Sequence, residues 1–315
     1  MEAAPYFAEI ADGPKGGAAH WLRADDGVRI RVAHWPVTEA QGTVLMFPGR
    51  TEFVEKFGRP AGELAARGFA SIAVDWRGQG LADRLSDNRK LGHVEHFSDY
   101  QRDVDAVVAH VRSLALPAPY FLVGHSMGGA IGLRALHRGI DVRAAAFSAP
   151  MWGIMMSPAL RPVAWTVSTL SKPLGMSRRF APGQEAEPYP LRQDFAGNTL
   201  TSDRDMYHHM RQQISAHPDL ALGGPSMHWL HEALTETREL ARKKAPAYPC
   251  ITFLGSEEAI VDVGRIRHVM AGWPGGTLTM LPGAQHEVMM EAPAIRARVY
   301  DGMVAHFRAH ALAPA

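Results

Sequence analysis

Residues 124–128, with the sequence Gly-His-Ser-Met-Gly, are the part of this 315-residue chain best suited to carry out chemistry. The apolar run 119–123 before them predicts a buried strand, and residues 129–136 after them predict a helix. A Gly-x-Ser-x-Gly turn between a strand and a helix is typical of a nucleophile elbow, in which strained backbone pushes the serine hydroxyl out of the turn. We therefore expect Ser126 to be a nucleophile. The alternative is a glycine-rich turn in which Ser126 only caps the helix.

A serine hydroxyl becomes an effective nucleophile when a base accepts its proton and an acid orients that base. His286 follows the last predicted strand directly, and this position distinguishes it among the 16 histidines. The loop after the apolar run 250–254 offers three acids, Glu257, Glu258 and Asp262. Asp262 precedes a helical stretch and has a ready role as its N-cap, whereas Glu258 is placed to reach back to the histidine loop. The residues favour Glu258 and leave the other two acids open.

The negative charge that develops on a carbonyl oxygen during acyl transfer is stabilised by backbone amides. We expect one amide from Met127, the residue after the nucleophile. The second expected donor is the N–H of Arg50, in the loop after the apolar run 43–47, where Gly49 permits a tight turn. The alternative is an ordinary turn between a strand and a helix.

Elements of two kinds alternate along the chain. Apolar runs predict strands at 28–37, 43–47, 70–74, 119–123, 144–147, 250–254 and 277–281, and helices are predicted at 57–67, 100–114, 263–271 and 292–311. This alternation is typical of an α/β fold with a mostly parallel sheet and helices on both faces. From about 151 to 245 the strand pattern stops. We therefore predict a core of residues 1–150 and 246–315 and a helical cap, 151–245, inserted after the sixth strand, which ends at Phe147. Such a cap would cover the carboxyl ends of the strands, where open α/β sheets bind ligands.

Composition excludes several classes of protein. The net charge of +1 does not favour nucleic acid as a partner, and a single cysteine, Cys250, allows no internal disulfide. We find no signal peptide and no spanning segment, so we expect a cytoplasmic protein. The segment 78–80, Gly-Gln-Gly, lacks the third glycine of a dinucleotide fingerprint, and the histidine pairs lack further ligands at metal-site spacing. We expect no cofactor and no metal.

Four segments together resemble the bacterial lysophospholipase L2 branch of the α/β-hydrolases, which is close to the monoacylglycerol lipases. They are 124–129 (GHSMGG), 75–80 (DWRGQG), 47–52 (FPGRTE) and 91–94 (LGHV). The resemblance covers about residues 20–310 and is weakest in the cap. It implies an α/β-hydrolase fold and a serine ester hydrolase without a cofactor.

The resemblance also bears on two candidate residues. The lipase motif His-Gly-x-Gly-Glu is altered here to Pro-Gly-Arg-Thr-Glu at 48–52, and its register places the N–H of Arg50 in the oxyanion hole. The lipase acid motif Gly-Ser-x-Asp becomes Gly-Ser-Glu-Glu at 255–258, which supports Glu258 as the acid.

The cap begins with the Met-rich segment 151–156, and methionine adapts well to a flexible acyl chain. Its basic residues would suit a phosphate headgroup or an anionic membrane surface; they are Arg161, Lys172, Arg178 and Arg179. The alternative is that these residues form the core and the solvated face of the cap itself. We expect a small-molecule acyl ester as substrate, either a lysophospholipid or a monoacylglycerol, and peripheral contact of the cap with a membrane.

Two rival functions remain at this point. An aminopeptidase of the same superfamily would need an acidic anchor for the substrate amine, for which Glu185, Glu187 and Asp194 are available. A non-catalytic binding protein on this fold would have no need of a nucleophile, a histidine and an acid at these positions.

Overall fold

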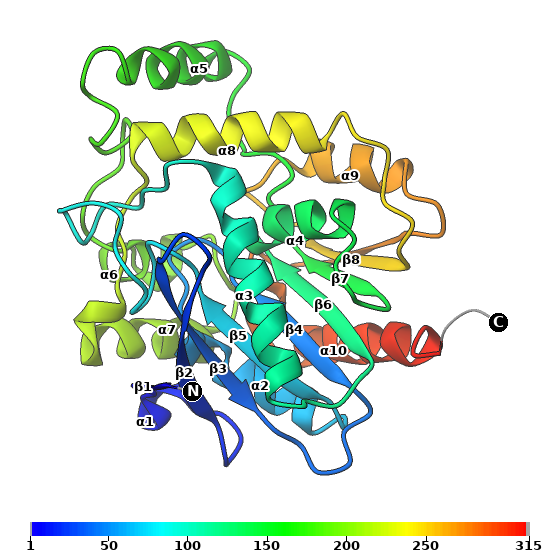
Figure 1. Cartoon of the computed structure of the whole chain (residues 1–315). Coiled ribbons are helices and arrows are strands. Elements are labelled where there is room, and N and C mark those ends of the chain that lie inside the picture. Colours follow the sequence, from blue (N-terminus) through cyan, green and yellow to red (C-terminus); the bar gives the residue numbers. More distant parts are fainter. Residues whose placement is uncertain (1, 313–315) are drawn as a thin grey trace.

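A nine-stranded sheet forms the centre of the protein, as the computed structural model in Figure 1 shows for the described residues 2–312. Its strands are β1 (Glu2–Ala4), β2 (Ala18–Arg23), β3 (Arg29–Trp35), β4 (Thr43–Phe47), β5 (Ala70–Asp75), β6 (Tyr120–His125), β7 (Ala145–Ser148), β8 (Cys250–Gly255) and β9 (Thr277–Leu281). Their order is β1-β2-β3-β5-β4-β6-β7-β8-β9. The pairs from β5 through β9 are parallel, and β1, β2 and β3 join antiparallel at one edge. The prediction of a mostly parallel sheet is therefore confirmed.

The central strands are mostly apolar because helices cover both faces of the sheet. Every residue of β4 and of β5 is buried. The register places Leu45 of β4 beside Ile72 of β5 and Leu122 of β6, so that three aliphatic side chains lie in one row. The chain passes from β4 to β5 on one side and then to β6 on the other. Ligands of open α/β sheets bind at the carboxyl ends of strands where the order reverses in this way.

Ten α-helices and five short 3-10 helices complete the described residues. The α-helices are α1 (Ala8–Ala11), α2 (Gly58–Ala65), α3 (Tyr100–Ser113), α4 (Met127–His137), α5 (Leu160–Ser171), α6 (Tyr189–Arg192), α7 (Arg204–Ala216), α8 (Met227–Leu240), α9 (Val263–Ala271) and α10 (Pro293–Ala309). The 3-10 helices are η1 (Val54–Phe57), η2 (Phe97–Asp99), η3 (Phe195–Gly197), η4 (Pro218–Leu220) and η5 (Val288–Met290). Residues of α3, α4 and α9 pack in one hydrophobic core, and those of α2 and α10 pack in the other. The two cores lie on opposite faces of the sheet (Figure 1).

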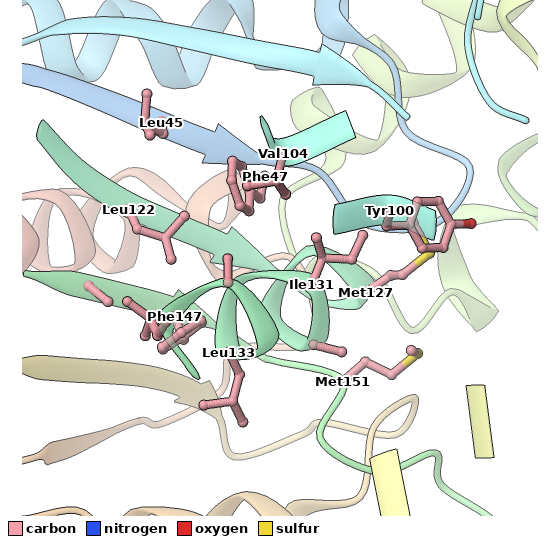
Figure 2. Close-up of a cluster of buried hydrophobic side chains, with 14 of the residues drawn as sticks. Leu45, Phe47, Tyr100, Val104, Leu122, Met127, Ile131, Leu133, Phe147 and Met151 are labelled. Atoms are coloured by element: carbon pink, nitrogen blue, oxygen red, sulfur yellow. The ribbon is translucent and has the colours of Figure 1, made fainter. Parts of the chain in front are cut away.

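The larger core surrounds α4, the helix that follows the predicted nucleophile. Ile131 and Leu133 of α4 belong to the same buried cluster as Leu122 of β6 and Phe147 of β7, and Figure 2 shows Leu133 close to Phe147. All four side chains are almost completely buried. This packing fixes α4 against the two strands, and with it the turn that carries Ser126.

The position of the helical insertion differs from the prediction in one respect. It follows β7, the seventh strand of the chain and not the sixth, because five predicted strands lead up to Phe147 and β1 and β2 precede the first of them. Neither has a recognisable pattern, since β1 has three residues and β2 is only half-buried. Residues 151–245 contain α5, α6, η3, α7, η4 and α8 and no strand. In Figure 1 these helices lie beyond one end of the sheet, with α5 outermost on α8.

No helix among the described residues has both the length and the apolar character needed to cross a membrane.

Three histidines pack together at the antiparallel edge of the sheet. The rings of His20 on β2 and His34 on β3 stack with centroids 5.3 Å apart, and His110 of α3 packs edge-on to His20 at 5.2 Å. One ring nitrogen of each is buried without a hydrogen-bond partner among the described residues. Burial, with a smaller contribution from His20, lowers the pKa of His34, and burial with both neighbours lowers the pKa of His110 to about 4.

Because burial lowers the pKa values of His34 and His110, we expect the folded protein to lose stability in mild acid. The unfolded chain takes up protons on histidine near pH 6.5, whereas folded His110 stays neutral until about pH 4. The contribution to the free energy of unfolding is therefore complete above pH 6.5 and decreases as the pH falls toward 4. We expect His110→Phe to flatten the dependence of Tm on pH in this range, measured by circular dichroism. His208→Gln, at an exposed position, should leave the slope unchanged, and equal slopes in both variants would contradict the prediction.

Candidate active site

Ser126 occupies a sharp turn between β6 and α4. Its backbone has φ 50° and ψ −119°, a region that non-glycine residues rarely adopt, so the turn is strained. Its N–H donates to the carbonyl of Ser148 at 3.0 Å, and its own carbonyl accepts from the N–H of Met151 at 2.7 Å. Only glycine fits at position 128, where a Cβ would overlap the carbonyl of Phe47. The strand, turn and helix expected around Ser126 are all present.

The segment after β7 begins against this turn. The indole Nε1 of Trp152 donates to the carbonyl of Gly129 in α4 at 3.1 Å, and the Trp152 ring stacks on Trp273 with centroids 6.0 Å apart. Trp152 is buried. Together with the bond between Met151 and Ser126, these contacts anchor the first residues of the insertion to the core.

His286 and Glu258 are joined by a hydrogen bond of 2.8 Å between Nδ1 and Oε2. Both side chains are buried. The other carboxylate oxygen of Glu258 accepts from the amides of Ile260 at 2.6 Å and Val261 at 3.1 Å. Burial raises the pKa of Glu258, but the charge and hydrogen bond of His286 and the two amides outweigh burial, so the pKa lies below its ordinary value. Glu258 is therefore ionised at neutral pH and fixes the orientation of the His286 ring.

The other two acids of this loop bind elsewhere. Asp262 caps α9 by accepting from the N–H of Arg265 at 3.0 Å, and it also accepts from Arg161 at 2.9 Å. Glu257 is exposed and accepts from the hydroxyl of Ser256 at 3.0 Å. Among the three candidates, only Glu258 is hydrogen-bonded to His286 in the described structure.

A cavity of about 560 Å³ lies where Ser126 and His286 meet the helical insertion. Its volume is in the range of typical small-molecule sites. Apolar side chains from the insertion and from the loop after β8 line it; they include Met151, Ile154, Met155, Met156, Trp229, Leu230, Ile260 and Val261. Arg50 lines the same cavity, so three of the predicted site residues share one space.

Of the two expected oxyanion donors, Met127 follows Ser126 in the chain, whereas Arg50 comes near it only in the fold. Met127 is the first residue of α4, and the first amides of a helix have no partner within the helix. Arg50 follows Gly49, whose Cβ position would lie 3.0 Å from the Cβ of Ser126. No hydrogen bond among the described residues uses the Arg50 amide. Both amides are therefore free to bind an oxygen atom of a ligand.

A buried group of charged residues beside Ser126 was not expected from the sequence. The Nζ of Lys56 donates to Glu287 Oε1 at 2.6 Å and also to Glu52. His125 lies with its Nε2 3.3 Å from Glu287 Oε2, and its Nδ1 is 3.0 Å from the Ser148 hydroxyl. Glu52 lies in the loop after β4, Lys56 lies in η1, and Glu287 lies in the loop after β9. His125 is the last residue of β6 and precedes Ser126. We call Glu52, Lys56, His125 and Glu287 the buried ion cluster.

The members of the buried ion cluster stabilise one another's charged forms. Burial raises the pKa of Glu287, but Lys56 and His125 outweigh burial and hold it well below its ordinary value. Burial lowers the pKa values of Lys56 and His125, but the two carboxylates outweigh it and raise both. Glu52 also accepts from the N–H of Gly49, so the cluster supports the loop that carries Arg50. The cluster therefore connects the loop of the expected oxyanion donor to the strand and loop that carry Ser126 and His286.

Three members of the cluster also have the composition of a metal site. Ligand atoms of Glu52, His125 and Glu287 lie within 4.8 Å of one another, and no other such group exists among residues 2–312. The ammonium of Lys56 already contacts both carboxylates and supplies the positive charge there. These residues are therefore better matched to an internal ion pair than to a metal ion.

Two sequence features pointed toward this cluster. Glu52 is the final residue of the Pro-Gly-Arg-Thr-Glu segment, and Glu287 follows His286 directly. Lys56 had no such signal, because a lysine just before a predicted helix is ordinarily exposed.

The acids of the rival aminopeptidase hypothesis are separated in the fold. Glu185 and Glu187 line the cavity, whereas Asp194 does not. Glu185 is paired with Arg192. Asp194 is exposed and lies 3.7 Å from Arg211. Only Glu187 combines a place in the cavity wall with no ion pair among the described residues.

Comparison with known proteins places this geometry in a family. A family profile described as "Serine aminopeptidase, S33" matches residues 38–293. Lysophospholipase L2 of Escherichia coli (strain K12) is 30% identical over 309 residues, which cover 90% of this chain and 86% of that protein. The chain belongs to the α/β-hydrolase superfamily. Probable lysophospholipase L2 of Haemophilus influenzae is 26% identical, with 96% of this α/β-hydrolase and 97% of the relative covered.

Solved structures share the α/β-hydrolase fold. A soluble variant of monoglyceride lipase from Saccharomyces cerevisiae, in complex with a substrate analog, superimposes with a TM-score of 0.72 at 21% identity, covering 93% of this chain and 95% of that one. A thermostable carboxyl esterase from Bacillus coagulans gives a TM-score of 0.74 at 16% identity, with 95% and 100% covered. The predicted fold class is thus confirmed, and this α/β-hydrolase is a hydrolytic enzyme.

The buried ion cluster predicts a large effect of removing its lysine. Lys56→Met leaves two buried carboxylates with only His125 to compensate them, and breaking a buried ion pair in this way typically costs about 3–5 kcal/mol in the free energy of unfolding. Urea unfolding measures this loss. Lys243→Met removes a half-exposed lysine that is paired with Glu239, and this control should lose about 1 kcal/mol or less. Equal losses in the two variants would show that the cluster has no special weight.

Proposed function

We propose that this protein is a serine carboxylic-ester hydrolase that acts on single-chain lipids, a lysophospholipid or a monoacylglycerol. The observation that carries the proposal is the hydrogen bond between His286 and Glu258 at the cavity that also contains the strained Ser126. A nucleophile in such a turn, a base and an ionised acid are the parts that acyl transfer requires.

The proposed reaction begins with Ser126. Its Oγ attacks the acyl carbonyl, and Nε2 of His286 accepts the hydroxyl proton, because Nδ1 holds its proton toward Glu258. The amides of Arg50 and Met127 bind the oxygen that becomes negative. His286 then protonates the departing alcohol, and the acyl group remains on Ser126. A water molecule, activated by His286, releases the fatty acid.

The proposed substrate class rests on the cavity and on the relatives. The methionine-rich wall suits an aliphatic chain, since methionine packs adaptably. The relatives named above are lysophospholipases and a monoglyceride lipase. An aminopeptidase is the second candidate, because the family profile carries that description and Glu187 lines the cavity.

We further propose that residues 151–245 act as a cap that meets a membrane surface at its outer helix. Large apolar side chains are exposed on α5 and its flanks; they are Met155, Leu160, Val163, Leu170 and Leu174. Lys172 lies among them. An exposed apolar helix face with basic residues is typical of proteins that bind peripherally to lipid.

The nucleophile is tested with a substrate panel and Ser126→Ala. The panel contains p-nitrophenyl esters of graded length, a monoacylglycerol, a lysophosphatidylcholine and an aminoacyl-naphthylamide. We expect ester hydrolysis by the wild type, and a fall in kcat of about 10⁶-fold, to background, in the variant. Cleavage of the amide alone would favour the aminopeptidase. No turnover, together with no labelling of Ser126 by a fluorophosphonate, would leave a binding protein.

The acid is tested by comparing two neighbouring carboxylates. Glu258→Gln keeps the shape of the side chain but removes the charge that orients His286, and we expect kcat to fall by roughly 10³- to 10⁴-fold. Asp262→Asn is the matched control, because Asp262 caps α9 and contacts Arg161. We expect this variant to keep kcat within about tenfold of the wild type, and the reverse order of effects would reassign the acid.

A further inference from the structure

The side chain of Arg50 brings a positive charge to the cavity without a carboxylate to neutralise it. Its Nη1 donates to the carbonyl of Gly223 at 2.8 Å, and its Cζ lies 5.7 Å from the ring centroid of Trp229. No acid among residues 2–312 forms an ion pair with it. The buried arginines of the core differ, since Arg31 is paired with two carboxylates, as is Arg77.

The Arg50 side chain is only partly exposed, and a guanidinium that is partly removed from water without a counter-charge is unfavourable unless an anion compensates it. Burial lowers the pKa of Arg50 to about 10, so the side chain is still a cation at neutral pH. Its remaining N–H groups make no hydrogen bond with the described residues. The planar fork of a guanidinium matches the oxygens of a phosphate, to which it forms charge-assisted pairs.

We propose that Arg50 binds the phosphate of the substrate headgroup and thereby makes a lysophospholipid the preferred substrate over a monoacylglycerol. The proposal rests on the ester hydrolase function proposed above. It adds a specificity residue, whose guanidinium selects the leaving group while its own amide serves the oxyanion.

The two groups that Arg50 offers, its backbone amide and its guanidinium, correspond to the two oxygen-bearing groups of a lysophospholipid, the ester carbonyl and the phosphate. In a lysophospholipid the glycerol carbons separate the ester carbonyl from the phosphate. In Arg50 the aliphatic part of the side chain separates the backbone amide from the guanidinium. A monoacylglycerol offers only a neutral hydroxyl to this cation, and the ammonium group of a peptide substrate would be repelled by it.

Arg192 provides an internal comparison, because it lines the same cavity. Its guanidinium is already paired with Glu185, so its charge is neutralised within the protein. The two arginines therefore share a location but differ in what they offer to an anionic ligand.

The test compares two substrates that differ by an anionic phosphoglycerol headgroup. A lysophosphatidylglycerol and a monoacylglycerol with the same short acyl chain are supplied below their aggregation concentrations, and the ratio of their kcat/KM values is measured. We expect Arg50→Gln to lower this ratio by roughly 10- to 100-fold, the effect of losing a charged hydrogen bond. Arg50→Lys should give an intermediate ratio. Arg211→Gln, which removes an arginine outside the cavity that lies 3.7 Å from Asp194, should keep the ratio within about twofold of the wild type.

An unchanged ratio in Arg50→Gln would overturn the proposal and leave the hydrolase function standing. A wild type that hydrolyses no ester would instead refute the proposed function, and binding then decides the role of Arg50. In the Ser126→Ala background, calorimetry should show at least about tenfold weaker binding of lysophosphatidylglycerol when Arg50→Gln is added. Equal binding, or Arg50-dependent binding of inorganic phosphate without any preference for the phospholipid, would overturn the proposal.

Discussion

The ammonium of Lys56, held between two buried carboxylates, is the interaction on which the arrangement of the candidate site depends. Glu52 belongs to the loop after β4 and Glu287 to the loop after β9, so a single cation fixes two segments that are far apart in the sequence. His125 brings the strand of the nucleophile into the same group. Such a cluster is stable only when all its members are present, because each buried charge depends on the others for compensation. The buried ion cluster thus fixes the loop after β4, the loop after β9 and the end of β6 relative to one another.

The charged groups near Ser126 differ in whether the protein itself supplies an opposite charge for them. Beside Ser126 the charges of the buried ion cluster compensate one another, and the Glu258 carboxylate accepts hydrogen bonds from His286 and two amides. On the cavity side the Arg50 guanidinium has one carbonyl partner and an aromatic face. The charges that hold the loops in position are therefore paired within the protein, whereas the positive charge of Arg50 remains unpaired at the cavity.

Much of this structure could be predicted from local sequence patterns. The strand, turn and helix around Ser126 were predictable because only glycines permit so tight an approach. The parallel strands were predictable because burial on both faces demands apolar runs. Pairings over long distances were not predictable: β1 and β2 depend on the sheet edge they join, and Lys56 is buried only because acids from two other loops surround it. Which of Glu258 and Asp262 is hydrogen-bonded to His286 likewise depended on the fold, since both acids follow one strand.

The contacts of Met151 and Trp152 have a consequence for how such an enzyme diversifies. The insertion is fastened to the nucleophile turn at its first residues, through the carbonyl of Ser126 and the carbonyl of Gly129. Ile154, Met155 and Met156 line the cavity and follow directly after that attachment, whereas the amides of His286 and Glu287 are bound farther along the insertion, by the carbonyls of Thr199 and Leu200. Substitutions within 154–156 can therefore reshape the cavity wall while the turn of Ser126 keeps its contacts, so natural selection or a protein engineer can alter specificity there without disturbing the groups proposed to react.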